Sequence, residues 1–115
     1  MESNRGGSYH KKLEKAINDG ATVILLDGGK VRLFKLSESS PYGASVLNDI
    51  KSYLAARLRE ERAKFPQDNS LICRTLRINR MVLWKALNYP QDVAVARQLN
   101  TLWSFGVTIS IGVTK

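Results

Sequence analysis

The apolar residues between Val46 and Phe65 recur at intervals of three and four, and this spacing restricts the fold more than any other feature of the chain. They are Val46, Leu47, Ile50, Tyr53, Leu54 and Leu58. Such a period places them along one side of an α-helix, and Pro66 ends the pattern because proline cannot continue a helix. A helix of this length carries a long apolar face, so other elements of the chain must cover it.

Two shorter helices are expected next. The first has three candidate capping residues, which are Asp68, Asn69 and Ser70. Its apolar residues are Leu71, Ile72, Cys73 and Leu76. A tight connection at Arg77 and Ile78 leads to Asn79, which is expected to cap a helix that runs to about Asn88. Tyr89-Pro90 then marks a break, since the residue before a proline is disfavoured in helical geometry.

A last helix is predicted from about Gln91 to Trp103, followed by a strand. The expected buried side of this helix comprises Val93, Val95, Ala96, Leu99, Leu102 and Trp103. In the segment SFGVTISIGVTK, apolar residues alternate with small or polar ones, which is the period of a half-buried strand. The apolar set is Val107, Ile109 and Ile111, and the alternating set is Thr108, Ser110 and Gly112.

The N-terminal third predicts a short helix and a β-hairpin. After a polar start, MESNRGGS, a helix is expected over Tyr9 to Ile17. The segment TVILLDGGKVRLFKL then has two aliphatic runs around Asp27-Gly28-Gly29, and glycines accept the positive φ that tight hairpin turns require. A linker, SESSPYGAS, covers residues 37–45. The predicted fold class is therefore α+β: a bundle of four to five helices with a small antiparallel sheet, made from the hairpin and the C-terminal strand.

Most of the net positive charge of the chain is concentrated in one region of the sequence. The 115 residues carry a net charge of +8, with a pI of about 9.9. Between Lys51 and Lys85 there are nine basic residues and three acidic ones, so this third of the chain holds +6 of the total. A basic region of this kind suits a polyanionic partner, although a membrane surface or solubility alone also accounts for it.

Several classes of function are disfavoured by what the sequence contains. The apolar runs are shorter than the ~20 residues that cross a bilayer, and the N-terminus has no apolar signal-peptide core, so a cytoplasmic protein is expected. Cys73 and His10 are single residues far apart in sequence, which gives neither a zinc ligand set nor a thiol triad. We expect no enzyme activity, no metal and no cofactor.

The helical region resembles a known family. The stretch LREERAKFPQDNSLICRTLRINRMVLWKALNYPQDVAVARQLNTLWSFGVTIS is similar to the helix-turn-helix domain of Cro-type and phage-repressor-type (XRE-like, lambda-repressor-like) regulators, over roughly residues 54–110. The matching features are the basic LREER, the small Cys73, the INR that opens the recognition helix, and the FGVTIS ending. A shorter motif, INRxxLxKxL, resembles the nucleoid protein Fis. Where the family usually has glycine in the turn, this chain has Arg77. Either a residue with a Cβ adopts the left-handed backbone there, at a cost of ~1 kcal/mol, or the turn differs from that of the family.

The resemblance implies a set of DNA-binding residues. In that family the recognition helix enters the major groove, where each base pair shows a distinct pattern of donors and acceptors. Arg80 would bind guanine, and Met81 and Trp84 would pack on thymine methyls or sugars. Asn69, at the start of the preceding helix, would bind a phosphate. The full predicted set is Asn69, Ser70, Arg74, Arg77, Asn79, Arg80, Met81, Trp84, Lys85 and Asn88.

Structural roles remain open for some of these side chains. Met81 and Trp84 can instead belong to the core or to a dimer interface, and Arg74 can be only a solvated charge. Cys73 is expected to be a small core residue. Ile78, Leu83 and either Ala86 or Leu87 are expected to point into the core.

Taken together, the sequence divides into three parts: an N-terminal helix and hairpin (1–40), a helix-turn-helix domain (41–105) and a terminal strand (106–115). DNA half-sites one helical turn apart require a two-fold dimer, so the β segments are interpreted as the dimerisation element, and deleting the strand after Gly106 should leave folded monomeric helices. The alternative is a sheet that completes one monomer's core.

The predicted function is a homodimeric repressor that binds a palindromic double-stranded DNA operator. Two alternatives remain: an antitoxin whose N-terminal unit covers a small toxin protein, and a non-specific nucleoid protein.

Overall fold

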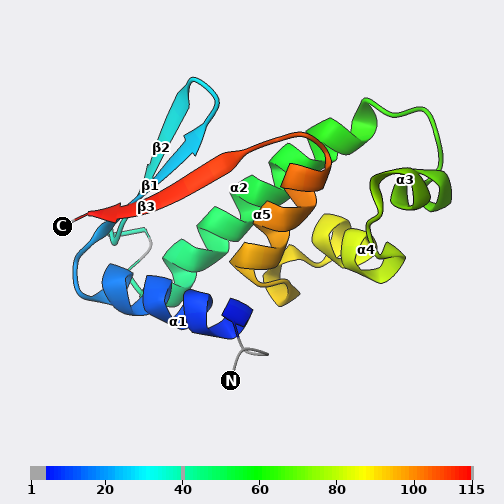
Figure 1. The fold of residues 1–115 in the computed structure, drawn as a ribbon. Helices are drawn as coiled ribbons and strands as arrows, with labels where there is room; N and C mark the ends of the chain where they lie inside the picture. The colour runs from blue at the N-terminus through cyan, green and yellow to red at the C-terminus, as the bar shows by residue number, and fades with distance from the viewer. Residues whose placement is uncertain (1–4, 40, 115) are drawn as a thin grey trace.

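The computed structural model describes residues 5–39 and 41–114 as five α-helices and a three-stranded antiparallel sheet (Figure 1). In chain order the elements are α1 (Arg5–Asn18), β1 (Thr22–Asp27), β2 (Lys30–Phe34), α2 (Gly43–Ala63), α3 (Asn69–Leu76), α4 (Arg80–Asn88), the 3-10 turn η2 (Pro90–Asp92), α5 (Val95–Ser104) and β3 (Ile109–Thr114). The predicted α+β class, with its hairpin and C-terminal strand in one sheet, is confirmed.

The sheet has the order β2-β1-β3, with β1 in the centre and antiparallel to both neighbours. The hairpin turn uses Gly28 at φ +63°, a backbone conformation that residues with a Cβ rarely adopt. β3 returns from the far end of α5 and runs alongside β1, pairing Thr22 with Thr114 at one end and Asp27 with Ile109 at the other. The N-terminal and C-terminal segments therefore meet in one sheet of the same chain.

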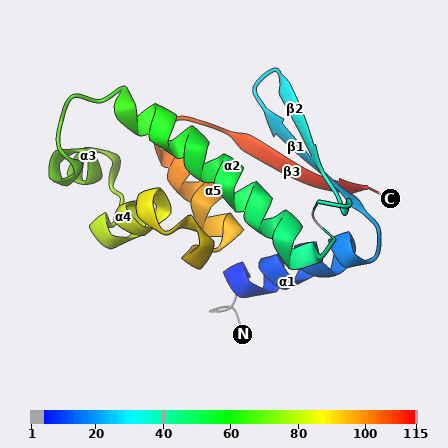
Figure 2. The same ribbon diagram turned by 180° about the vertical axis from the view of Figure 1, so that it is seen from behind.

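The core is shared by all parts of the described chain. It includes Leu13 and Ile17 of α1, Val23 and Leu25 of β1, the apolar face of α2, and residues near the C-terminus. The C-terminal members are Val95, Leu102, Phe105, Val107 and Ile109. Figure 2 shows α2 running through the molecule, with α1 and the hairpin near its start and α3 beyond its end. The long helix predicted from its apolar period is thus the element against which the others pack.

Several predicted boundaries differ from the structure. α1 begins at Arg5 and not at Tyr9. α2 begins at Gly43, inside the predicted linker, and the N–H of Gly43 donates to Asn18 Oδ1 at 3.0 Å. A Cβ at Gly43 would lie 2.6 Å from that oxygen, so any other residue here would displace the Asn18 amide and disturb this hydrogen bond.

The prediction for the last helix was wrong about its start and about the burial of Trp103. α5 begins at Val95 and not at Gln91, because residues 90–92 form the separate turn η2 and Ala94 is extended. Trp103 is 68% exposed, although it was expected in the core. Val93, Val95 and Leu102 are buried as expected, and Gln98, Thr101 and Phe105 are also buried, although they were not predicted.

A buried ion cluster joins the sheet to α2. Asp27, at the end of β1, is 7% exposed and accepts hydrogen bonds from Arg57 Nε and from the Tyr53 hydroxyl, each at 2.7 Å. Arg57 also donates to Glu61 at 2.9 Å, and Lys64 donates to the same carboxylate. Burial raises the pKa of Asp27, but the hydrogen bonds from Arg57 and Tyr53 outweigh it, so the net pKa lies below its usual value of 3.8.

Replacing Asp27 with asparagine is expected to lower the free energy of unfolding by about 2–3 kcal/mol at neutral pH, because it removes the most deeply buried of the charges that pair with the partly buried Arg57. Because the folded-state pKa of Asp27 is lowered, its contribution is present above the unfolded value of 3.8 and is lost as the pH falls through the folded value. Urea unfolding at about pH 7 and about pH 3 should therefore show a smaller difference between variant and parent at the lower pH. Asp19→Asn, which affects an exposed pair with Lys15, should change stability by under ~0.5 kcal/mol. A pH-independent difference would contradict the assignment.

Candidate nucleic-acid interface

The helix α3 is fixed at its start by two side chains. Asp68 caps it, with its Oδ1 accepting the N–H of Leu71 at 2.9 Å. Arg62, near the end of α2, donates to Asn69 Oδ1 and to the backbone carbonyls of Phe65 and Gln67. Of the three candidate caps, the structure selects Asp68. The side-chain oxygen of Asn69 accepts a hydrogen bond from Arg62. The predicted phosphate contact of this side chain would therefore be made by its amide nitrogen.

The connection between α3 and α4 is a left-handed turn at Arg77, with φ +60° and ψ +46°. The N–H groups of Arg77 and Ile78 both point to the carbonyl of Cys73, which closes the end of α3. Asn79 then caps α4, because its Oδ1 accepts the N–H of Met81 at 2.8 Å and of Val82 at 3.2 Å. Both the capping role of Asn79 and the left-handed arginine are confirmed.

Helix α4 has one face in the core and one face open to solvent. Leu83 and Ala86 are fully buried, whereas Ile78 and Leu87 are partly buried against the core. The opposite face consists of exposed residues: Arg80, Met81, Trp84, Lys85 and Asn88. Met81 is 59% exposed and Trp84 is 46% exposed, so neither belongs to the core of this chain. What remains open for these two side chains is contact with DNA or with another chain.

Two predicted contact residues are partly engaged within α4 and the turn after it. Trp84 packs on Tyr89, with ring centroids 5.2 Å apart. The side-chain amide of Asn88 donates to the carbonyl of Trp84 at 2.9 Å, which holds Asn88 along the helix and uses one of its donors. Arg80 and Lys85, by contrast, project from α4 as exposed cations.

Helix α2 supports the end of α4 from behind. Arg59 donates to the carbonyl of Leu87 through Nε and Nη2, at 3.3 and 3.1 Å. Lys51 is only 5% exposed and donates to the carbonyl of Gln91 at 3.0 Å. Burial lowers the pKa of this ammonium, and the nearby Asp92 partly opposes the change. Two basic residues of the charged region are thus structural, and they fix the position of α4 relative to the core.

Exposed cations surround α4 on both sides. A hollow between α3 and the start of α4 is lined by Ser70, Arg74, Arg80, Cys73 and Ile78. A second hollow, between α4 and the start of α5, is lined by Asn79, Met81, Val82, Lys85, Asp92, Val93, Ala94 and Arg97. Over residues 5–39 and 41–114, no ion pair links Arg74, Arg77, Arg80, Lys85 or Arg97 to an acidic side chain.

The sequence analysis did not identify Arg97 as a candidate. Its position depends on where α5 begins, and η2 delays that start to Val95. The structure otherwise brings the predicted residues of α3, the turn and α4 to one end of the molecule. This arrangement can attract an extended anion and present an arginine, a methionine and a tryptophan to it.

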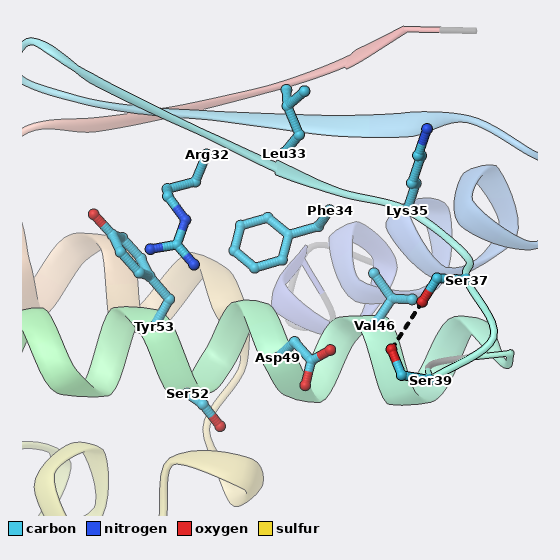
Figure 3. A pocket seen from close by; sticks show the side chains of 10 residues that line it. All are labelled: Arg32, Leu33, Phe34, Lys35, Ser37, Ser39, Val46, Asp49, Ser52 and Tyr53. Carbon is cyan, nitrogen blue, oxygen red and sulfur yellow. Dashed lines mark hydrogen bonds between the residues drawn. The ribbon is translucent and has the colours of Figure 1, made fainter.

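A separate cavity lies between β2 and α2, away from α4 (Figure 3). Arg32 and Phe34 point from β2 toward α2, and the Arg32 guanidinium lies 5.1 Å from the centre of the Tyr53 ring. Phe34 meets Tyr53 edge-on at 6.4 Å. The lining of this cavity combines two basic residues, Arg32 and Lys35, with Asp49 and several serines. Such mixed, open surroundings do not define a ligand class.

No cluster of three or more metal-binding side chains occurs among residues 5–39 and 41–114. Cys73 is buried as predicted, and burial raises the pKa of its thiol despite the nearby Arg80 and Arg62. Within the same part of the chain, no helix has the length and apolarity to cross a membrane.

Comparison with known protein families, curated proteins and solved structures finds no match to this chain.

Proposed function

We propose that this protein is a sequence-specific, double-stranded-DNA-binding transcriptional regulator. It acts as a homodimeric repressor in the cytoplasm, at the nucleoid, and inserts α4 into the major groove of a palindromic operator. The observation that carries this proposal is the exposed face of α4, where Arg80, Met81, Trp84 and Lys85 stand together on a helix held rigidly by α2. The opposite face of α4 already covers the core, so the exposed set is not needed for packing within this chain.

The roles within the interface follow from the chemistry of each side chain. Arg80, in the first turn of α4, can reach two acceptors of a guanine in the major groove. Met81 and Trp84 offer apolar surface to thymine methyls or sugars. Arg74 and Arg77 flank the helix and neutralise phosphates, which fixes orientation without reading sequence. Repression, as opposed to activation, suits a described fold in which a single core holds every element.

Substitution Arg80→Ala is expected to weaken binding to a selected duplex by about 10- to 100-fold, as for the loss of a bidentate base contact. Binding to random duplex should weaken by only several-fold, since that binding depends on total charge. Fluorescence anisotropy with both duplexes measures this ratio. Lys12→Ala removes the same charge from an exposed position on α1 and should leave the ratio unchanged.

Three outcomes would contradict this assignment. Equal weakening on both duplexes would make Arg80 a phosphate contact, and comparable parental affinity for both duplexes would favour a non-specific nucleoid protein. Unchanged binding to both would show that α4 is not the DNA-binding surface. Circular dichroism of each variant checks that the fold is retained.

A further inference from the structure

One face of the three-stranded sheet is not covered by any described part of the chain. Side chains alternate along each strand, so Val23 and Leu25 face the core while their neighbours face outward. Figure 3 shows this for β2, where Leu33 points away from α2 and Arg32 and Phe34 point toward it. By the strand register, this outer face comprises Thr22, Ile24, Leu26, Val31, Leu33, Ser110, Gly112 and Thr114.

None of these eight residues is charged, and four of them are aliphatic. Lys35, which follows β2, points to the same side as Leu33 and borders this face (Figure 3). Leu26, Val31 and Leu33 are 45%, 59% and 62% exposed, and Ile24 lies between them on the central strand. Contiguous exposed aliphatic groups of this kind are typical of interaction surfaces. The chain has a net charge of +8, so two copies repel one another over most of their surfaces. The aliphatic middle of this face is an area on which a second copy can approach with less of that repulsion.

The outer face is also asymmetric in a way that suits its own copy. One row across the sheet reads Leu33, Ile24, Gly112, and the next reads Val31, Leu26, Ser110. Each row therefore has large side chains on β2 and β1 and a small residue on β3. A two-fold axis parallel to β1, lying in the plane of contact, places the β2 side of one copy over the β3 side of the other. Leu33 then meets the partner copy's Gly112, and Val31 meets the partner copy's Ser110.

We propose that two copies of this chain associate through the outer face of the sheet, packed face to face about this axis. The proposal deepens the homodimer of the proposed function, but its surface is defined by the sheet and not by α4. Sheets pack in this way about 10 Å apart, with their side chains interdigitated. The pairing of β3 with β1 within one chain leaves the face intact in each copy, so no strand exchange is needed.

The size of the face sets the expected strength. Three strands of five or six residues present a surface of about 14 by 20 Å. This is smaller than the roughly 800 Å² per partner typical of stable complexes. We therefore expect a weak dimer in the absence of DNA, with a dissociation constant on the order of 10–100 µM. An operator that binds both copies would raise their effective concentration and hold the dimer together.

The test is sedimentation velocity of the full chain without DNA, from about 5 to 500 µM, which spans this range. Val31→Lys places a charge on the outer face and should raise the dimer dissociation constant at least about 10-fold. The matched control is Val113→Lys, because Val113 is similarly exposed, at 47%, and belongs to the same sheet but pairs with Val23 on the opposite face. This control should dimerise like the parent.

A second variant uses the small residue. A Cβ at Gly112 would meet no atom within 4 Å in the single chain, so Gly112→Thr should leave the monomer's thermal stability unchanged or raised, because glycine weakens strands. In the dimer, the methyl and hydroxyl groups of the threonine introduced at position 112 would fill the space that the partner copy's Leu33 occupies. The dimer should therefore weaken although the fold is unharmed.

DNA titration separates the two proposals. Val31→Lys should bind a single half-site as the parent does, while losing affinity for the two-half-site duplex. A parent chain that stays monomeric up to about 500 µM, or a dimer unaffected by Val31→Lys, would overturn the proposed surface while leaving α4 untouched. Dissociation by Val113→Lys alone would place the contact elsewhere on the sheet, and a monomer that binds a different small protein would favour the antitoxin alternative.

Discussion

Removing residues 107–115 is expected to unfold the whole chain. Val107 and Ile109 are each 9% exposed and belong to the same core as α1, α2 and α5. Without β3, the hairpin becomes a two-stranded sheet, which is marginal in water. Loss of two buried aliphatic side chains and one strand removes about 5 kcal/mol or more, comparable with the total stability of a small domain. Helical circular dichroism and a cooperative thermal transition should both be lost.

This result would reverse the expectation drawn from the sequence, which treated the terminal strand as separable from the helices. A shorter deletion that ends the chain after Gly112 is the control, because it keeps Val107, Ile109 and Ile111, and it should remain folded. If the chain ending at Gly106 instead keeps a cooperative helical transition, the sheet is not part of the monomer's core.

Affinity for DNA should fall by about 100- to 1,000-fold between ~50 and ~200 mM salt. The exposed cations Arg74, Arg77, Arg80, Lys85 and Arg97 lie around α4, and each phosphate that they neutralise releases counterions. Four to six such contacts give a slope of about −4 to −5 in a plot of log affinity against log salt.

Individual substitutions refine the salt prediction. Arg74→Ala should reduce the slope by about one and weaken selected and random duplexes alike, since a phosphate contact carries no sequence information. Arg59→Ala offers a contrast, because this exposed arginine is bonded to the carbonyl of Leu87 and should affect the position of α4 more than the slope. An affinity that is independent of salt would exclude nucleic acid as the partner.

The local signals in the sequence predicted most of the fold because they depend on neighbours in the chain. The spacing of apolar residues identified α2, the two glycines identified the hairpin, and Asn79 identified the start of α4. Arg77 was expected in a left-handed turn, and it occupies one. Each of these features is decided by backbone geometry within a few residues.

The remaining features depend on contacts between distant segments. The early start of α2 follows from the approach of Gly43 to Asn18, and no local pattern encodes this contact. Trp103 was placed in the core because it follows the helical period, but α5 turns that position outward. In the candidate site, Arg97 was missed and Asn69 proved to be bonded to Arg62, since both depend on how α2, α3 and α5 meet.

The central claim, that the exposed face of α4 binds DNA, is tested most directly by nuclear magnetic resonance. A selected duplex is added stepwise to the uniformly ¹⁵N-labelled chain, and the backbone amide shifts are followed. The largest changes should fall on Ser70, Arg74 and the residues from Arg77 to Lys85, with Arg97 also affected, while α1 shows little change. Changes confined to α1 and the sheet, or no changes under low-salt conditions, would contradict the claim.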